Sequence, residues 1–202
     1  MAKFRVPPFL WLAPLRVVGA LCLLGCGENP VYPILPDDPS NLVVNGGFER
    51  PRVRGREYLS YGSGDPIVGW TIEGPIDQLA RPIWGPADGS QSVDLDGSCG
   101  TGGVHQDLPT EPGILYVLRF AFAGNPNGGP SIKQVEITWG GAVVDTVEFD
   151  STGGSKAEPG WVWYRYAVLA HAEVTRLGFR SLSPGCYGGL LDAVDVRTMP
   201  SI

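Results

Sequence analysis

The run from Ile114 to Ala123 most limits what this chain can fold into. Successive side chains of a strand point to opposite faces, which gives an apolar repeat of two residues. One face carries Ile114, Tyr116, Leu118, Phe120 and Phe122, and the other carries Leu115, Val117, Arg119 and Ala121. Both faces are largely apolar, so we expect a central strand of a β-sandwich.

Short strands and tight turns are predicted along the rest of residues 41–198. Further strands are expected at 42–45, 68–73, 92–96, 104–108, 134–139, 161–168, 176–181 and 190–197. Turn signals such as Asp96-Gly97 and Gly140-Gly141 separate them. No window has convincing helical periodicity. The sequence therefore predicts an all-β jelly-roll β-sandwich over residues 41–198, with a short tail at 199–202.

The first 25 residues have the features of an export signal. Three basic residues and no acid precede a short apolar run that ends at Cys26. The run is too short for a bilayer, which needs about 20 apolar residues. Residues 23–26, Leu-Leu-Gly-Cys, resemble a bacterial lipobox. We therefore predict a lipoprotein signal peptide at 1–25 and lipidation at Cys26; the alternative is an ordinary secreted protein with an incidental cysteine.

Residues 26–40 are predicted to be a spacer behind this lipid. Prolines 30, 33, 36 and 39 recur every third residue, and a polyproline II helix has about 3 residues per turn. A semi-rigid spacer of this kind, or an irregular proline-rich linker, would hold the folded domain away from the lipid. The expected location is outside the cytoplasmic membrane, anchored to it through the lipid and facing the periplasm or the exterior.

The net charge restricts the classes of binding partner, and the cysteine content indicates a disulfide. The formal charge of the chain is −6, and loss of the three basic residues within 1–25 would make it −9. Such a chain is not expected to bind nucleic acid or an anionic membrane surface directly, and we expect a monomer. Cys99 and Cys186 are the cysteines of the domain. An oxidising compartment favours a disulfide between them over a Cys99–His105 nucleophile.

An ordered set of short motifs carries a family resemblance. They are Asn45-Gly46-Gly47-Phe48-Glu49, Gly69-Trp70, residues 86–97, Ala123-Gly124-Asn125-Pro126 and residues 187–194. The set resembles the bacterial choice-of-anchor C family, which is similar to plant cell-wall extracellular domains of unknown function. It is similar, more distantly, to galactose-binding-like jelly-roll carbohydrate-binding modules. The resemblance covers residues 41–197 and implies a sandwich that binds polysaccharide or packs into a wall or matrix, and not an enzyme.

The same resemblance implies a structural calcium ion at Glu49 and Asp192. In the related sugar-binding jelly rolls these positions lie together, and calcium prefers carboxylate and carbonyl oxygens. Ala193 stands where family members usually carry a second polar or acidic residue, which weakens the prediction. The alternative is that Glu49 is a solvated turn residue and Asp192 an ordinary strand acid.

Candidate sugar contacts come from aromatic and polar residues. Trp84, Tyr58 and Tyr61 are surrounded by turn residues, and their rings could stack on the apolar face of a sugar. Gln106 and Arg119 could donate hydrogen bonds from a sheet face. For any single tryptophan, burial in the core is the competing explanation, because aromatic residues dominate buried area.

Residues 50–66 are predicted to form a long, exposed, basic loop. Its arginines could bind an anionic polysaccharide through paired donors to each carboxylate, or could simply keep the loop soluble.

No phosphate loop, serine elbow or zinc-binding His-Glu-x-x-His motif is present. Asp88, Asp94 and Asp96 could pair as in a glycoside hydrolase, but turn roles explain two of them. We expect a non-catalytic carbohydrate-binding module; the alternatives are an adhesion protein that recognises another protein, and a glycan hydrolase.

Overall fold

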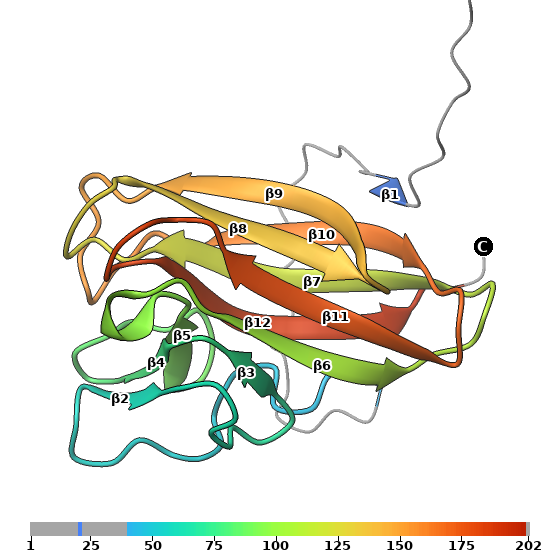
Figure 1. The fold of residues 1–202 in the computed structure, drawn as a ribbon, viewed down its shortest axis with the longest axis horizontal. Helices are drawn as coiled ribbons and strands as arrows, with labels where there is room; N and C mark the ends of the chain where they lie inside the picture. Colours follow the sequence, from blue (N-terminus) through green and yellow to red (C-terminus); the bar gives the residue numbers. More distant parts are fainter. Residues whose placement is uncertain (1–19, 22–39, 201–202) are drawn as a thin grey trace, which may run out of the picture.

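The computed structural model describes residues 20–21 and 40–200, which form two antiparallel sheets and one short 3-10 helix, η1 (Gly97–Cys99) (Figure 1). The seven-stranded sheet contains, in spatial order, β1 (Ala20–Leu21), β10 (Val162–Leu169), β7 (Leu115–Gly124), β12 (Gly189–Thr198), β5 (Gln91–Asp94), β4 (Ile76–Ala80) and β2 (Tyr58–Tyr61). The five-stranded sheet contains β3 (Thr71–Glu73), β6 (Gly103–Pro109), β11 (Val174–Ser181), β8 (Ile132–Trp139) and β9 (Ala142–Asp150). The predicted all-β jelly-roll sandwich is confirmed.

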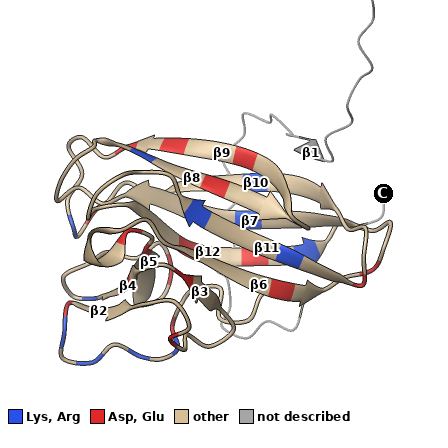
Figure 2. Ribbon diagram, in the orientation of Figure 1, with Lys and Arg blue, Asp and Glu red and all other residues tan. Residues whose placement is uncertain are grey.

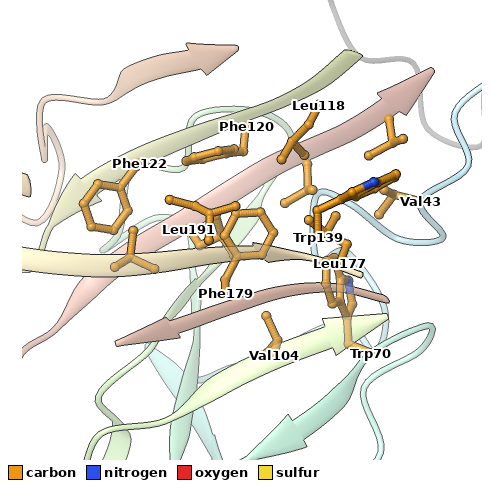
Figure 3. Packing of buried hydrophobic residues seen from close by; sticks show 14 of the residues in the cluster. Val43, Trp70, Val104, Leu118, Phe120, Phe122, Trp139, Leu177, Phe179 and Leu191 are labelled. Carbon is orange, nitrogen blue, oxygen red and sulfur yellow. The ribbon is translucent and has the colours of Figure 1, made fainter. Parts of the chain in front are cut away.

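The core lies between the two sheets and is rich in aromatic rings (Figure 3). Phe120 of β7 contributes a fully buried ring, which stacks on Tyr164 of β10 at 5.3 Å between centroids. It also meets Phe179 of the facing sheet edge-on at 5.0 Å. Such pairs each contribute about 0.5–1.5 kcal/mol beyond burial alone. As predicted, β7 is a central strand, with β10 and β12 on either side.

Four strands were not predicted. They are β1, β2, β4 and β9, and the whole of 50–66 was expected to be loop. β9 is an edge strand whose residues are mostly exposed, so its sequence lacks a clear apolar face. β4 contains a fully buried Gln78, which interrupts its apolar pattern. Residues 42–45, predicted as a strand, are turn and irregular backbone beside β12.

Asn41 fixes the start of the domain against its last strand. Its side-chain oxygen accepts hydrogen bonds from the backbone N–H of Val43 at 3.0 Å and of Val196 at 2.9 Å. Its amide donates to the carbonyl of Val194 at 3.3 Å, and Leu42 N–H donates to the carbonyl of Val196 at 2.9 Å. The chain therefore enters the sandwich beside the end of β12.

A cluster of loops lies at the opposite end of β12. Gly189, the first residue of β12, pairs with Gly124 at the end of β7, and Leu190 pairs with Asp94 at the end of β5. The segments that follow β5, follow β7 and precede β12 therefore meet there. A disulfide joins Cys99 to Cys186 between two of these segments, as predicted.

The predicted signal peptide, Cys26 and the proline spacer lie outside the described residues, except for Ala20 and Leu21. The backbone of these two residues pairs with Val168 and Ala167 of β10. Within residues 20–21 and 40–200, no helix has the length and apolar character needed to cross a membrane.

Candidate functional site

Glu49 and Asp192 together hold the loop between β4 and β5. Asp192 Oδ2 accepts hydrogen bonds from the backbone N–H of Ala87 at 2.8 Å and of Asp88 at 3.0 Å. Glu49 Oε1 accepts from the N–H of Ser90 at 2.6 Å and of Gln91 at 2.9 Å. The two carboxylates therefore satisfy four backbone donors that the turn itself leaves unpaired.

Two glycines near these acids, Gly89 and Gly46, leave no room for a side chain. A Cβ atom on Gly89 would lie 2.3 Å from Glu49 Oε1, and a Cβ on Gly46 would lie 1.9 Å from the carbonyl oxygen of Val194. Gly89 also has a φ of +59°, in the left-handed region that favours glycine. Beside Asp192 the register of β12 shifts, and Ala193 has a φ of 52°, as at a β-bulge.

These two acids fit the predicted calcium ion only in part. They are neighbours, because a Cβ on Gly47 would lie 3.8 Å from Glu49 Cγ and 3.9 Å from Asp192 Oδ1. Burial raises the pKa of Asp192 well above its ordinary value, so a nearby cation would be favourable. However, Asp192 already accepts three backbone hydrogen bonds, the third from Ala193. Among the described residues no three His, Cys, Asp or Glu side chains form a metal-binding group, so the other ligands would have to be backbone carbonyls, neutral side-chain oxygens or water.

Two predicted sugar contacts are wrong. Trp84 is 4% exposed, because the loop that carries it folds over the outer face of the seven-stranded sheet. Its ring packs with Leu79, Ala123 and Leu190, and Lys156 Nζ lies 5.2 Å from the ring centroid. Gln106 points inward and is 7% exposed. Its amide group accepts from Val44 N–H at 2.8 Å and donates to Val44 C=O at 3.0 Å, so it is a structural clamp.

Tyr58 and Tyr61 both lie on β2, an edge strand that pairs with β4, but their side chains point to opposite faces of the sheet. Tyr58 is 48% exposed. Tyr61 is half-buried, and its hydroxyl donates to Gln78 Oε1 at 2.9 Å. Arg119 lies on β7, on the outer face of the seven-stranded sheet. The predicted contacts therefore do not converge on one site, and Tyr58 is the accessible aromatic residue among them.

The segment before β2, residues 48–54, has a backbone that two buried glutamines fix. Gln78 Nε2 donates to the carbonyls of Phe48 at 2.7 Å and Pro51 at 2.8 Å. Gln91 Nε2 donates to the same two carbonyls, and its Oε1 accepts from Val53 N–H at 2.6 Å. Val53 is itself buried. The sequence contains no signal for these clamps, since Gln78 lies in a segment that was not predicted as a strand and Gln91 lies just before the strand predicted at 92–96.

Arginines 52 and 54 project from this fixed segment, Arg56 follows it, and all three are exposed. We call residues 50–56 the basic loop; they appear as blue stretches beside β2 in Figure 2. In the part of the chain that the structure describes, no acidic side chain lies within salt-bridge distance of these three arginines. The five-stranded sheet differs. On its outer face Arg176 binds Asp107 through two bonds of 2.7 and 2.9 Å, and Arg180 lies 3.0 Å from Glu136.

A buried charged cluster lies beneath the disulfide. Asp94 accepts hydrogen bonds from Asn125 Nδ2 at 2.6 Å, Asp96 N–H at 2.9 Å and Gly188 N–H at 3.0 Å. Asp96 is fully buried, and neither of its carboxylate oxygens has a hydrogen-bond partner among the described residues. Burial raises the pKa of Asp94 to about 7 and that of Asp96 to about 6. Lys133, also fully buried, donates to the carbonyls of Gly128 and Tyr187.

Solved structures with similar folds include several carbohydrate-binding modules. A family 35 module from Clostridium thermocellum is 19% identical and has a TM-score of 0.46; the match covers 70% of this chain and 98% of the module. TmCBM61 in complex with β-1,4-galactotriose is 18% identical, with a TM-score of 0.49 and coverage of 79% and 99%. A family 16 module is 15% identical, with a TM-score of 0.48 and coverage of 77% and 99%.

Among curated proteins, the chain is similar to halomucin of Haloquadratum walsbyi. The two are 27% identical over 188 residues, which are 89% of this chain and 2% of halomucin. The chain thus spans a small part of that relative's length.

The family comparison covers the whole sandwich. The sequence matches the family described as "Protein of unknown function (DUF642)" over residues 41–197. This supports the resemblance to extracellular domains of unknown function, whereas the choice-of-anchor C assignment stays a prediction. The match begins at Asn41, which fixes the start of the sandwich, and ends within β12, so this chain belongs to the DUF642 family.

Proposed function

We propose that this protein is a non-catalytic, extracytoplasmic module that binds anionic polysaccharide through its basic loop. One observation carries the proposal: Arg52, Arg54 and Arg56 are exposed and have no acidic partner among the described residues. Each guanidinium can offer two parallel N–H donors to one carboxylate, which is the geometry that uronic-acid residues of a polysaccharide require.

The fixed backbone of the basic loop supports this role. The side-chain amides of Gln78 and Gln91 bind backbone groups within residues 48–53, and the buried side chain of Val53 lies between Arg52 and Arg54 in the sequence. A loop that is already ordered loses less conformational entropy when it binds, so more of the contact energy becomes affinity. Tyr58 follows the loop on β2 and is 48% exposed, so its ring is available to the apolar face of a sugar.

The overall charge favours binding at this loop rather than elsewhere. The chain carries a formal charge of −6, and an anionic polymer would be repelled by most of its surface. Electrostatic attraction would therefore orient the polymer toward the basic loop. Lipidation at Cys26 and the proline spacer, both proposals from the sequence, would place the domain at a membrane surface facing envelope or extracellular polymer.

Retention on immobilised polymers tests the proposal. We expect purified protein to be retained on polygalacturonate at 0.1 M salt and to be released near 1 M salt, where the Debye length falls from about 10 Å to about 3 Å. Neutral cellulose and chitin should retain much less. Arg52→Ala/Arg54→Ala should abolish retention.

The matched control is Arg176→Ala/Arg180→Ala, which removes the same charge from arginines that already have acidic partners. Equal losses in both variants would mean that net charge, and not the basic loop, drives binding. If no anionic polymer is retained by wild type, the adhesion alternative, recognition of another protein, takes the place of this proposal.

A further inference from the structure

Two arginines lie directly opposite each other on the outer face of the seven-stranded sheet. Arg119 of β7 pairs in register with Arg165 of β10. The neighbouring residues Phe120 and Tyr164 stack in the core, and side chains alternate between faces along a strand. Arg119 and Arg165 therefore both point away from the core, with Cβ atoms about 5 Å apart as in any cross-strand pair.

Neither of these arginines has an acidic partner within the described part of the chain. Asp195 of β12 lies opposite Arg119 on the other side, but it is 1% exposed and accepts a 2.7 Å hydrogen bond from Arg197 Nε. Like charges directly opposite each other destabilise a sheet. On the five-stranded sheet the arrangement is different: Arg176 lies opposite Asp107, and Arg180 lies opposite Glu136. Among the described residues, neither Arg119 nor Arg165 thus forms an ion pair of the kind that Arg176 and Arg180 form with their cross-strand acids.

Trp163 holds one of the two guanidinium groups in place. The ring lies two residues before Arg165 on β10, and the guanidinium carbon of Arg119 is 5.9 Å from its centroid. A cation–π contact of this kind restrains Arg119 without neutralising its charge. Trp163 is half-buried and Arg165 is exposed. The guanidinium group of Arg119, which the ring restrains, therefore lies beside the solvent-exposed side chain of Arg165 and next to the ring of Trp163.

We propose that Arg119, Arg165 and Trp163 form a second anion-binding subsite, which takes the carboxylate or sulfate of an acidic sugar residue. The anionic group supplies the missing counter-charge, and the exposed part of the indole contacts the apolar face of the sugar ring. The proposal deepens the proposed function, on which it rests for the class of ligand. The basic loop precedes β2 at one edge of the seven-stranded sheet, whereas β10 and β7 lie toward the other edge. A long polymer that engages both sites would gain avidity, and a monosaccharide would not.

Monosaccharide titration of the wild-type protein tests the subsite directly. The probes are glucuronate, a sulfated monosaccharide (N-acetylglucosamine 6-sulfate) and neutral glucose, each followed by the indole N–H resonance of Trp163, which Trp163→Phe identifies. Glucuronate, the sulfated sugar or both should shift that resonance, and the comparison of the two identifies the preferred anion. Glucose should leave the resonance in place.

Two variants separate a binding role from a structural one. Arg165→Gln removes the cross-strand repulsion, so the melting temperature without ligand at low salt should rise by about 1–3 °C. The affinity for the anionic sugar should nevertheless fall at least tenfold, because a charged hydrogen-bond donor is lost. Arg165→Glu would create the kind of ion pair found on the other sheet, and should stabilise the protein further while abolishing binding. Arg176→Gln is the control for a charge lost elsewhere.

The outcomes distinguish this proposal from the one on which it rests. A wild-type Trp163 resonance that no anionic sugar moves, or an Arg165→Gln variant that melts lower than wild type without ligand, overturns the subsite even when polymer is retained through the basic loop. Conversely, monosaccharide binding at Trp163 with no retention on any polymer supports the subsite and overturns the proposed polysaccharide function.

Discussion

Substitution of Asp96 by asparagine should stabilise the protein at neutral pH and reduce the pH dependence of its stability. Asp96 is fully buried, and neither carboxylate oxygen accepts a hydrogen bond of regular geometry from the described residues, although the Ser181 side chain is close enough to lower the pKa of Asp96. Asp94, beside it, accepts three hydrogen bonds. Burial raises the pKa of Asp94 to about 7 and that of Asp96 to about 6, so both acids bind their protons more tightly in the native state than in the unfolded chain. Asp96 is the acid whose replacement by an amide disturbs no hydrogen bond among those described for the cluster.

The size and sign of the effect follow from the pKa of Asp96. Burial raises it from an ordinary 3.8 to about 6, against opposing effects of Ser181 and Lys133. The native state therefore holds this proton more tightly than the unfolded chain does. The contribution of Asp96 to the free energy of unfolding should fall as pH rises from about 4 to about 6, and then level off. At about 1.36 kcal/mol for each pH unit, the loss is roughly 3 kcal/mol at most.

Urea unfolding followed by tryptophan fluorescence between pH 4 and pH 8 would measure this. Asp96→Asn should match wild type near pH 4 and exceed it by up to about 3 kcal/mol at pH 7. Asp94→Asn serves as the contrast: it disturbs three existing hydrogen bonds, so it should destabilise the protein across the whole range. If the stability difference between Asp96→Asn and wild type does not change with pH, the pKa of Asp96 is not raised in the native state and the reasoning is wrong.

Three further predictions concern the metal, the disulfide and the anchor. If Glu49 and Asp192 share a calcium ion, a hundredfold excess of calcium over Kd should add about 2.7 kcal/mol to the free energy of unfolding, and chelation should remove this and lower the melting temperature. Glu49→Gln should remove the sensitivity to chelation, and a wild-type melting curve indifferent to calcium would contradict the ion. The Cys99–Cys186 disulfide closes a separation of 87 residues, so Cys99→Ser/Cys186→Ser should lower the free energy of unfolding by on the order of 4 kcal/mol in the chain-entropy model; unchanged urea midpoints with and without reductant would show that the disulfide does not stabilise the fold. Cys26→Ser should move the protein from the membrane fraction to the soluble fraction, and mass spectrometry of wild type should find acyl chains on Cys26; their absence would contradict lipidation.

The sandwich was predictable because core-facing and outward-facing side chains alternate regularly along its central strands. β7 and β10 carry large apolar or aromatic side chains at every second position, and this period of two is a local property of the sequence. β4 was missed for a reason that is not local. Gln78 is buried only because the backbone carbonyls of Phe48 and Pro51, about 30 residues earlier in the chain, accept its hydrogen bonds.

The candidate site was less predictable, because exposure depends on how loops pack. Trp84 lies among turn residues, which suggested an exposed ring, but its loop folds back onto Leu79 and Leu190. The proximity of Glu49 and Asp192 came from a family resemblance and not from spacing. The Arg119–Arg165 pair needs the register of two strands, which a sequence of alternating residues leaves undetermined by itself.

The Asn41 clamp also has a mechanical consequence. The backbone of Leu42 and the side chain of Asn41 bind residues 194–196 near the end of β12, so the two ends of the domain lie side by side. Tension applied between these ends would load this small group of hydrogen bonds first, with little leverage on the aromatic core. The loops at the far end of β12, which the Cys99–Cys186 disulfide joins, would be spared until the clamp gave way.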